Sequence, residues 1–251
     1  MSTEPNSPVW PEGYDRIILD AVGSTMVEAA RLAPELKRPT WIMARQQTAA
    51  RGRQGRPWQH PAGNLAATLL MRPGGPVQEA ALRSFFAANA LFESLALYVD
   101  RTKLGVKWPN DVLLSEGKVA GILLESMGNA TGVDWLAIGV GVNLKHAPDD
   151  LRDAAFPPVC LADHSEAPAP EVFLDALAAN FATEEAIFAE LGFAKIRDNW
   201  LKRAARLGEV ITARTSKEDI TGTFESVDAL GNLVLRTPKG AKIIPAADVY
   251  F

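Results

Sequence analysis

The pattern of apolar residues changes near Leu207, and this change limits the architecture more than any other part of the sequence. Before it, apolar residues recur over stretches long enough for amphipathic helices and a large sheet. After it, only short strand-like runs remain, separated by turns at residues 230–232 and 238–240. Short strands at close spacing predict a small β-barrel of about five strands. We therefore expect a large domain over residues 15–206 and a small barrel domain over residues 207–251.

The large domain is predicted to be α+β, with helices flanking a mixed β-sheet. Runs rich in β-branched residues predict strands over residues 16–22, 41–47, 65–71 and 135–144, and two more over 106–125 joined by a turn at 115–117. Apolar residues at helical spacing predict helices over residues 25–36, 77–99, 171–191 and 194–205. Residues 1–14 are predicted to form a flexible tail, and residues 148–170 an irregular, proline-rich segment.

The composition excludes several classes of function. The chain has 251 residues, 47% of them hydrophobic and 22% charged, which favours a folded core over disorder. A formal net charge of −4 argues against bulk electrostatic binding to nucleic acid. No apolar run approaches the ~18 residues of a membrane span. Cys160 is the single cysteine, so a reducing, cytoplasmic location is the simplest interpretation, and the three scattered histidines form no zinc-binding pattern.

Residues 45–56, RQQTAARGRQGR, hold four arginines and no acidic residue. Glycines at positions 52 and 55 let the backbone N–H groups approach a ligand closely. Arginine forks match carboxylates and phosphates, so that the segment is a candidate anion-binding loop. A solvated basic loop, or a patch that touches nucleic acid, explains the same pattern.

Three further segments combine polar groups with strand-like runs: KWPND at residues 107–111, KVAGILLE at residues 118–125 and GVGVN at residues 139–143. Pro109 indicates an interrupted strand end. Lys118 opens an apolar run, as a cation at the mouth of an apolar pocket would, although a strand-end lysine that reaches water would look the same. The GVGVN segment is too short for a dinucleotide-binding fingerprint, and the sequence has neither a Walker A motif nor a GxSxG elbow.

Taken in order, these segments resemble the biotin protein ligases. That family shows a Ser-Thr pair at a first helix, a Gln before a GRGRxGR loop, a KWPND segment, a K-(V/L)-A-G-I-L-(V/L)-E strand and a G-(V/I)-N strand end. The corresponding residues here are Ser24-Thr25, Gln47, 50–56, 107–111, 118–125 and 141–143. Two positions depart from the pattern: Ala50 replaces the first loop glycine, and Met26 replaces a usual Asn. The early start of the match resembles the ligase-only form, without an N-terminal DNA-binding domain.

The resemblance implies a class II synthetase-like catalytic domain with an SH3-like C-terminal barrel. It implies that biotin is activated with ATP to biotinyl-5'-AMP and transferred to a lysine of a biotin carboxyl carrier protein. The implied catalytic residues are Lys118, Arg53 and Asp111. The implied biotin contacts are Ser24, Thr25, Gln47, Arg51, Arg53, Lys118 and Gly121, and the implied nucleotide contacts are Arg51, Trp58, Lys107, Asn110 and Asn143.

Biotin and ATP are the expected substrates, with Mg²⁺ to neutralise the pyrophosphate, no protein-held metal, and a homodimer by analogy. Two alternatives remain. A lipoate-type ligase shares the fold and the adenylation chemistry but lacks the KWPND tryptophan. A non-enzymatic biotin sensor would bind biotin without labelling a carrier domain.

Overall fold

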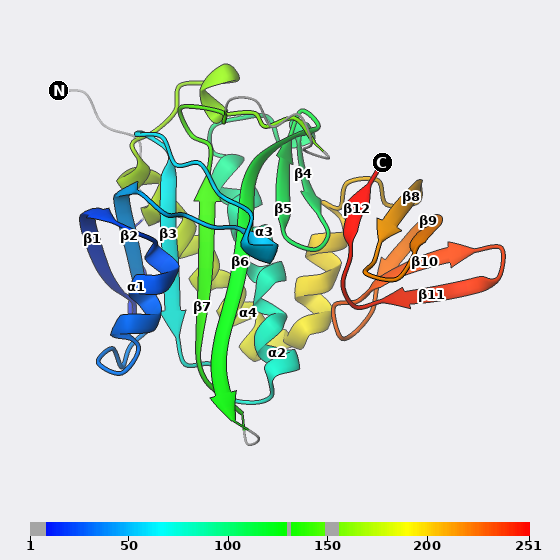
Figure 1. Cartoon of the computed structure of the whole chain (residues 1–251), viewed down its shortest axis with the longest axis horizontal. Helices are drawn as coiled ribbons and strands as arrows, with labels where there is room; N and C mark the ends of the chain where they lie inside the picture. Colours follow the sequence, from blue (N-terminus) through cyan, green and yellow to red (C-terminus); the bar gives the residue numbers. More distant parts are fainter. Residues whose placement is uncertain (1–8, 130–131, 149–155) are drawn as a thin grey trace.

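The computed structural model describes residues 9–129, 132–148 and 156–251, and its larger part is a mixed sheet of seven strands (Figure 1). The strands are β1 (Asp15–Val22), β2 (Thr40–Gln47), β3 (Leu65–Met71), β4 (Leu104–Lys107), β5 (Asp111–Leu114), β6 (Gly117–Asn129) and β7 (Gly132–Val142). Their order is β1-β2-β3-β7-β6-β5-β4; β1 and β2 pair in parallel and the other neighbours are antiparallel. The predicted mixed sheet is confirmed.

Helices cover both faces of this sheet (Figure 1). The helix α1 (Thr25–Leu32) lies on one face, and α3 (Arg83–Leu95) and α4 (Pro170–Leu201) pack together on the other. Successive side chains of β2 point to opposite faces of the sheet. Trp41 and Met43 pack in the core under α3 and α4, whereas Ile42 packs in the smaller cluster under α1. Burial on both faces explains why the first part of this strand, residues 41–44, is an unbroken apolar run, whereas Arg45 and Gln46 beyond it are exposed.

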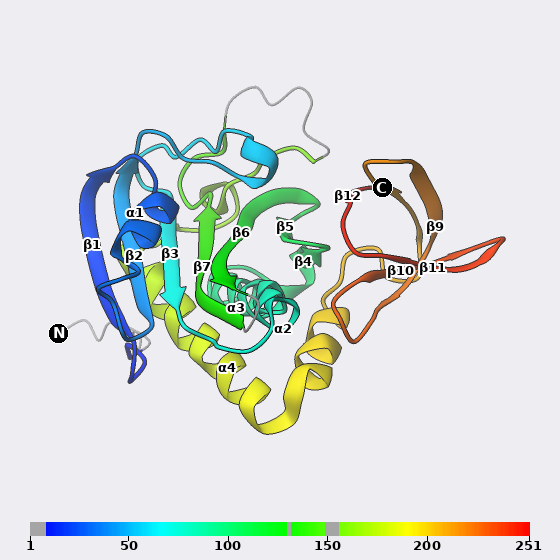
Figure 2. The same cartoon turned by 60° about the horizontal axis from the view of Figure 1, so that its bottom comes forward.

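The C-terminal part is a separate antiparallel sheet, which Figure 2 shows beside the end of α4. Its strands are β8 (Val210–Arg214), β9 (Asp219–Val227), β10 (Leu233–Thr237), β11 (Gly240–Ile244) and β12 (Asp248–Tyr250), in the order β11-β10-β9-β8-β12. The five predicted short strands are confirmed. Trp108 Nε1 donates a hydrogen bond of 3.0 Å to the Gly231 carbonyl, which ties the KWPND segment to this sheet.

Proline and glycine account for several differences from the predicted boundaries. The helix α1 ends at Leu32 instead of residue 36, because Pro34 cannot donate a helical hydrogen bond. Pro109 likewise splits the first of the two strands predicted over 106–125 into β4 and β5. The predicted break between two C-terminal helices falls at Gly192, whose φ of 71° interrupts α4.

The helix predicted over residues 77–99 is two helices, α2 (Val77–Ala81) and α3, that meet at Leu82. The Leu82 N–H bonds to the carbonyls of Ala80 and Glu79 rather than following the α-helical pattern, although its backbone angles remain helical. Periodicity alone does not reveal such a junction, because the apolar face continues across it.

The predicted flexible tail is packed from Trp10 onward. Trp10 and Tyr14 lie against the main core, and Trp10 Nε1 donates 2.9 Å to the Tyr14 carbonyl. The Arg16 guanidinium stacks 4.7 Å from the Trp10 ring centroid. Residues 1–8 of the predicted tail and residues 149–155 of the predicted irregular segment lie outside the described residues. Of the helices described, none is both long and apolar enough to cross a membrane.

Candidate active site

A buried charged cluster lies where β4, β5 and β6 begin and end. Lys107 and Asp111 face each other in register across the short turn between β4 and β5, and Lys118 is the second residue of β6. Asp111 Oδ1 lies 2.7 Å from Lys118 Nζ, and its Oδ2 lies 3.4 Å from Lys107 Nζ. The Lys107 and Asp111 side chains are only 7% and 11% exposed, so that water screens this cluster little.

The electrostatics of the cluster favour binding of an anion. Burial raises the pKa of Asp111, but the charges of Lys118 and Lys107 outweigh it and hold the pKa of that carboxyl below its ordinary value. Burial lowers the pKa of Lys107 by more than the Asp111 charge raises it. The Phe156 ring lies 4.5 Å from Lys107 Nζ and covers this ammonium. One ionised carboxylate thus faces two lysines, which leaves excess positive potential at the site.

The basic loop, residues 50–56, folds back on itself beside this cluster. The Gly52 N–H donates 2.8 Å to the Arg56 carbonyl, and the Trp58 N–H donates 3.0 Å to the Ala50 carbonyl. The turn between them uses left-handed backbone at Gln54 (φ 56°) and Gly55 (φ 71°).

The loop brings Arg53, but not Arg51, to the KWPND segment. Arg53 Nη1 donates 3.0 Å to Asn110 Oδ1, while Asn110 Nδ2 donates 2.6 Å to the Ile122 carbonyl of β6. Arg51 Nη2 instead lies 3.0 Å from Glu125 Oε2, in a pair whose side chains are 45% and 36% exposed. Arg51 is therefore engaged with the solvent side of β6, away from the lysine cluster.

Adjacent glycines leave the sheet bare next to Lys118. Gly121 of β6 pairs with Gly141 of β7, and the Trp58 indole lies across both of them. A Cβ added to Gly141 would lie 2.5 Å from Trp58 Cε2, and one added to Gly121 would lie 3.2 Å from Trp58 Cζ3. The Lys118 ammonium is 5.6 Å from the Trp58 ring. The Trp58 indole therefore packs flat against the bare backbone of the two glycines and fills the space above them. We call this space, with Lys118 at one end, the slot; it is closed by Trp58 in this structure.

Polar side chains lie near the other end of this bare strip, where α1 begins. Gln47 Oε1 accepts hydrogen bonds from the backbone N–H (2.7 Å) and the hydroxyl (3.2 Å) of Thr25. Ser24, next to it, is 4% exposed. Thr68 of β3 donates 2.8 Å to the Thr25 hydroxyl, and Thr68 pairs with Gly139 of β7. The structure thus brings together the predicted Thr25 and Gln47 and adds Thr68, which the sequence analysis missed because it is one polar residue within an apolar strand.

Asn143 is placed differently from the predicted nucleotide contact. Its side chain is buried and Nδ2 donates to the backbone carbonyls of Val159 (3.1 Å) and Lys118 (3.5 Å). It therefore fastens a neighbouring segment to the start of β6.

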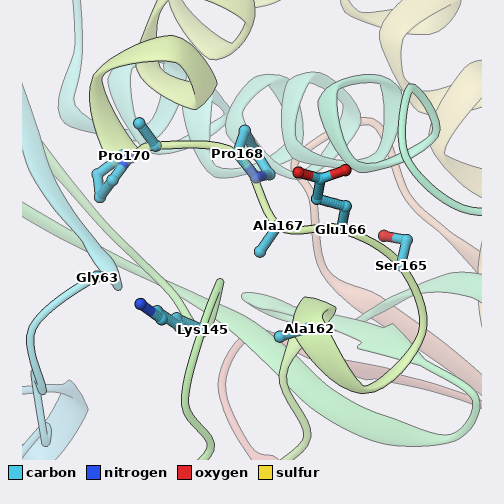
Figure 3. A pocket seen from close by; sticks show the side chains of 9 residues that line it. Gly63, Lys145, Ala162, Ser165, Glu166, Ala167, Pro168 and Pro170 are labelled. Atoms are coloured by element: carbon cyan, nitrogen blue, oxygen red, sulfur yellow. The ribbon is translucent and has the colours of Figure 1, made fainter.

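A cavity of about 510 Å³ lies apart from these residues, at the N-terminal end of α4. Figure 3 shows its lining, with Lys145 and Glu166 as the charged members. The remaining lining residues are small or apolar apart from Ser165: Gly63, Ala162, Ala167, Pro168, Ala169 and Pro170. It contains none of the residues that the motifs single out.

Metal ligands are not grouped in the described parts of the chain. Over residues 9–129, 132–148 and 156–251, no three His, Cys, Asp or Glu side chains are arranged to hold a metal ion. The buried Asp111 carboxylate is held by two lysines, which compete with a cation for its oxygens.

Comparison with known proteins accounts for both parts of the fold. Residues 20–143 match the Biotin/lipoate A/B protein ligase family, and residues 207–251 match the Biotin protein ligase C terminal domain. The structure is similar to that of the biotin protein ligase from Aquifex aeolicus in complex with biotin and ATP. The TM-score is 0.76 and the sequence identity 25%, over 94% of this chain and 98% of that one.

Sequence relatives narrow the family further. The chain is 50% identical over 238 residues to a biotin–[acetyl-CoA-carboxylase] ligase of Paracoccus denitrificans, which covers 93% of this chain and 99% of that protein. It is 30% identical over 250 residues to the bifunctional ligase/repressor BirA of Bacillus subtilis, over 94% of this chain and 74% of that protein. With these matches along almost its whole length, the chain belongs to the biotin protein ligases.

Proposed function

We propose that this enzyme activates biotin with ATP and attaches it to a lysine of a biotin carboxyl carrier protein, with chemistry centred on the Lys107–Asp111–Lys118 cluster. In the first step a biotin carboxylate oxygen bonds to the α-phosphorus of ATP, and the bond from that phosphorus to the pyrophosphate breaks. Both reactants are anions, so the barrier falls where fixed cations offset their repulsion. The observation that carries the proposal is this buried cluster beside a glycine-floored slot.

Within this proposal, Lys118 is the cation nearest to the reacting groups. Its ammonium lies both at Asp111, 2.7 Å away, and beside Trp58 at the end of the slot. Asp111 fixes the direction of Lys118 and Lys107 and stays ionised, because its pKa is lowered. Arg53, oriented by Asn110, adds a cation from the loop side. Lys107 and Asn110 then face the nucleotide phosphates.

The slot suits biotin because its two ends differ in chemistry. The Thr25, Gln47 and Thr68 group offers hydroxyl and amide atoms to a ureido ring, and Ser24 adds a further hydroxyl. Once the Trp58 indole moves off Gly121 and Gly141, their bare backbone lets the flat ring system and chain lie on the sheet. Lys118 at the opposite end is placed for the carboxylate. Trp58 has two roles open to it, to cover biotin or to stack on adenine.

In the second step the neutral amine of the acceptor lysine attacks the anhydride carbonyl carbon and AMP leaves. The attacking nitrogen must lose a proton, and Asp111 is a poor acceptor for it because its pKa is lowered. We assign Asp111 to orientation and not to this proton transfer.

Mg²⁺, in this proposal, enters with the ATP phosphates instead of occupying a site built by the protein. Mg²⁺ commonly keeps several waters and binds through substrate phosphates, which agrees with the lysine-held state of Asp111. Use of a carrier protein as acceptor follows the activity named for the Paracoccus relative. A homodimer and a cytoplasmic location stay predictions.

The test is a ligation assay with purified enzyme, biotin, Mg-ATP and a biotin carrier domain. We expect pyrophosphate release and a carrier mass increase equal to one biotin, with lipoate a poor substitute. Equal use of lipoate would favour a lipoate-type ligase. Biotin binding without pyrophosphate release or labelling would identify a sensor.

A further inference from the structure

The C-terminal sheet contributes a carboxylate to the basic loop. Asp248, the first residue of β12, accepts a hydrogen bond of 2.8 Å from Arg56 Nη2 through its Oδ2. Its Oδ1 lies 3.7 Å from Arg53 Nη1. Two arginines of the loop thus converge on one side chain that follows them by almost 200 positions along the chain. Neither the basic loop nor the KWPND segment predicts this contact.

The two arginines differ in what else holds them. Arg53 is directed at Asn110, in the KWPND segment, and is 30% exposed. Arg56 is 63% exposed and its Nη2 also donates 3.0 Å to Gln54 Oε1 of the same loop. Arg56 therefore points outward from the lysine cluster and joins the loop to Asp248. Arg53 thus divides its contacts between Asn110 and Asp248, whereas Arg56 contacts Gln54 and Asp248 and ties the loop to β12.

The anchor itself is firmly placed. Asp248 is 24% exposed, and its neighbour Val249 is buried at 2% and paired with Ala213 of β8. Beyond β12, the Phe251 ring packs edge-on against Phe156, with 4.6 Å between ring centroids. A carboxylate on a fixed strand loses little conformational freedom when it pairs, which makes it more effective than one on a mobile segment.

We propose that Asp248 is a positioning residue that anchors the basic loop over the active site through Arg56 and thereby retains the acyl-adenylate until the acceptor lysine arrives. The proposal rests on the adenylation chemistry proposed above. Asp248 acts mainly through Arg56, with a longer contact to Arg53, and itself contacts no reacting atom. It gives the C-terminal sheet a direct part in adenylate retention. Loss of the anchor lets the loop open more often, which releases the reactive anhydride to water and to unrelated amines.

The rate of tryptic cleavage in the basic loop measures how often the loop opens. The bonds after Arg51 and Arg53 are open to cleavage, whereas the bond after Arg56 precedes Pro57 and resists it. The experiment compares full-length wild type, Asp248→Asn, Arg56→Gln and the double variant. Asp219→Asn is the matched control, because Asp219 forms an exposed ion pair with Arg214 within the same sheet. Two rates are measured: tryptic cleavage of the loop, and loss of biotinyl-5'-AMP formed from biotin and Mg-ATP.

We expect each single variant to raise both rates about twofold to fivefold, as loss of one partly exposed ion pair allows. The double variant should add little to either single change, and Asp219→Asn should match wild type. Additive effects, or an Asp248→Asn enzyme that matches the control in both rates, would overturn the proposal. If wild type forms no adenylate, the proposed function fails separately, and the tryptic rates still decide whether Asp248 anchors the loop.

Discussion

Replacing Asp111 with Asn keeps the shape of the side chain and removes the one negative charge that two lysines share. Lys107 is then left 7% exposed without its nearest counter-ion and with only the more distant Asp248 charge, whereas Lys118, at 32%, can turn toward water. Removing one partner of a buried pair costs about 3–5 kcal/mol, mostly because the remaining charge stays desolvated. With Lys118 partly relieved by solvent, we expect Asp111→Asn to lower the free energy of unfolding by about 3 kcal/mol.

The origin of that loss can be separated from simple loss of packing. If the uncompensated Lys107 charge is responsible, the double variant Lys107→Met/Asp111→Asn should be more stable than Asp111→Asn alone, because it buries no unpaired ammonium. The deficit of Asp111→Asn should also shrink as pH rises, since burial lowers the pKa of Lys107 and deprotonation removes the charge. The single and the double variant should both be inactive, because Lys118 has lost the Asp111 carboxylate that orients it.

Urea unfolding, followed by circular dichroism and by tryptophan fluorescence, measures these differences. Coincident transitions show that one cooperative unit is observed, and an unchanged slope shows that the native state remains compact. Asp111→Asn within about 1 kcal/mol of wild type would refute the argument that the buried charge dominates, given the ~3 kcal/mol expected. A double variant less stable than the single variant would refute it as well.

Three further outcomes are expected. Lys118→Ala should slow pyrophosphate release by ~10²-fold or more, the scale for one preorganised electrostatic contact; a rate within a few-fold of wild type would reduce Lys118 to a strand-end lysine. Gly141→Ala should weaken biotin binding in calorimetry, because its Cβ would lie 2.5 Å from Trp58. Gly105→Ala is the control and should bind biotin as wild type does, because its Cβ would lie 3.4 Å from its nearest neighbour. Equal affinities of the two variants would contradict the role of the slot. Burial, aided by Glu185, raises the pKa of Tyr14 from 10.0 to about 12, so its stabilising effect is full below pH 10 and is lost as pH rises toward about 12. The free energy of unfolding, measured with urea, should therefore fall less for Tyr14→Phe than for wild type between about pH 9 and about pH 11. Identical losses would show that Tyr14 ionisation does not contribute to the alkaline loss of stability.

The central strands were predictable because their sequences satisfy local and tertiary demands together. β3 and the first part of β2 are largely apolar and buried on both faces, and the bounds of both strands differ from the predicted ones by at most one residue. Helix ends were less predictable. Pro34 could have located the end of α1, but the junction at Leu82 leaves no trace in composition or period.

The site was predictable to the extent that its residues occur in short motifs. Lys107, Asp111 and Lys118 come together because two tight turns fold their strands side by side. Asp248 and Thr68 escaped notice for the opposite reason, because each stands alone in its own strand. Their roles depend on pairings made far along the chain, and no local pattern encodes these. Arg51 pairs with Glu125 here, because membership of a motif does not decide whether an arginine turns inward or outward, and its predicted ligand contact stays a prediction.

Asn143 shows how a motif residue can serve a site from beneath it. Its side-chain Nδ2 donates to the backbone carbonyls of Lys118 and Val159, and its backbone carbonyl accepts from the Leu161 N–H. The Lys118 backbone is in turn clamped by Pro157 and Val159, at 2.9 and 3.1 Å. Phe156, whose ring covers the Lys107 ammonium, directly precedes Pro157. Because these backbone bonds set where the Lys118 side chain starts, Asn143 fixes the lysine's position even though its own amide points into the protein. A polar residue at the end of a buried strand must satisfy such backbone groups first, and its predicted contact with the nucleotide stays a prediction.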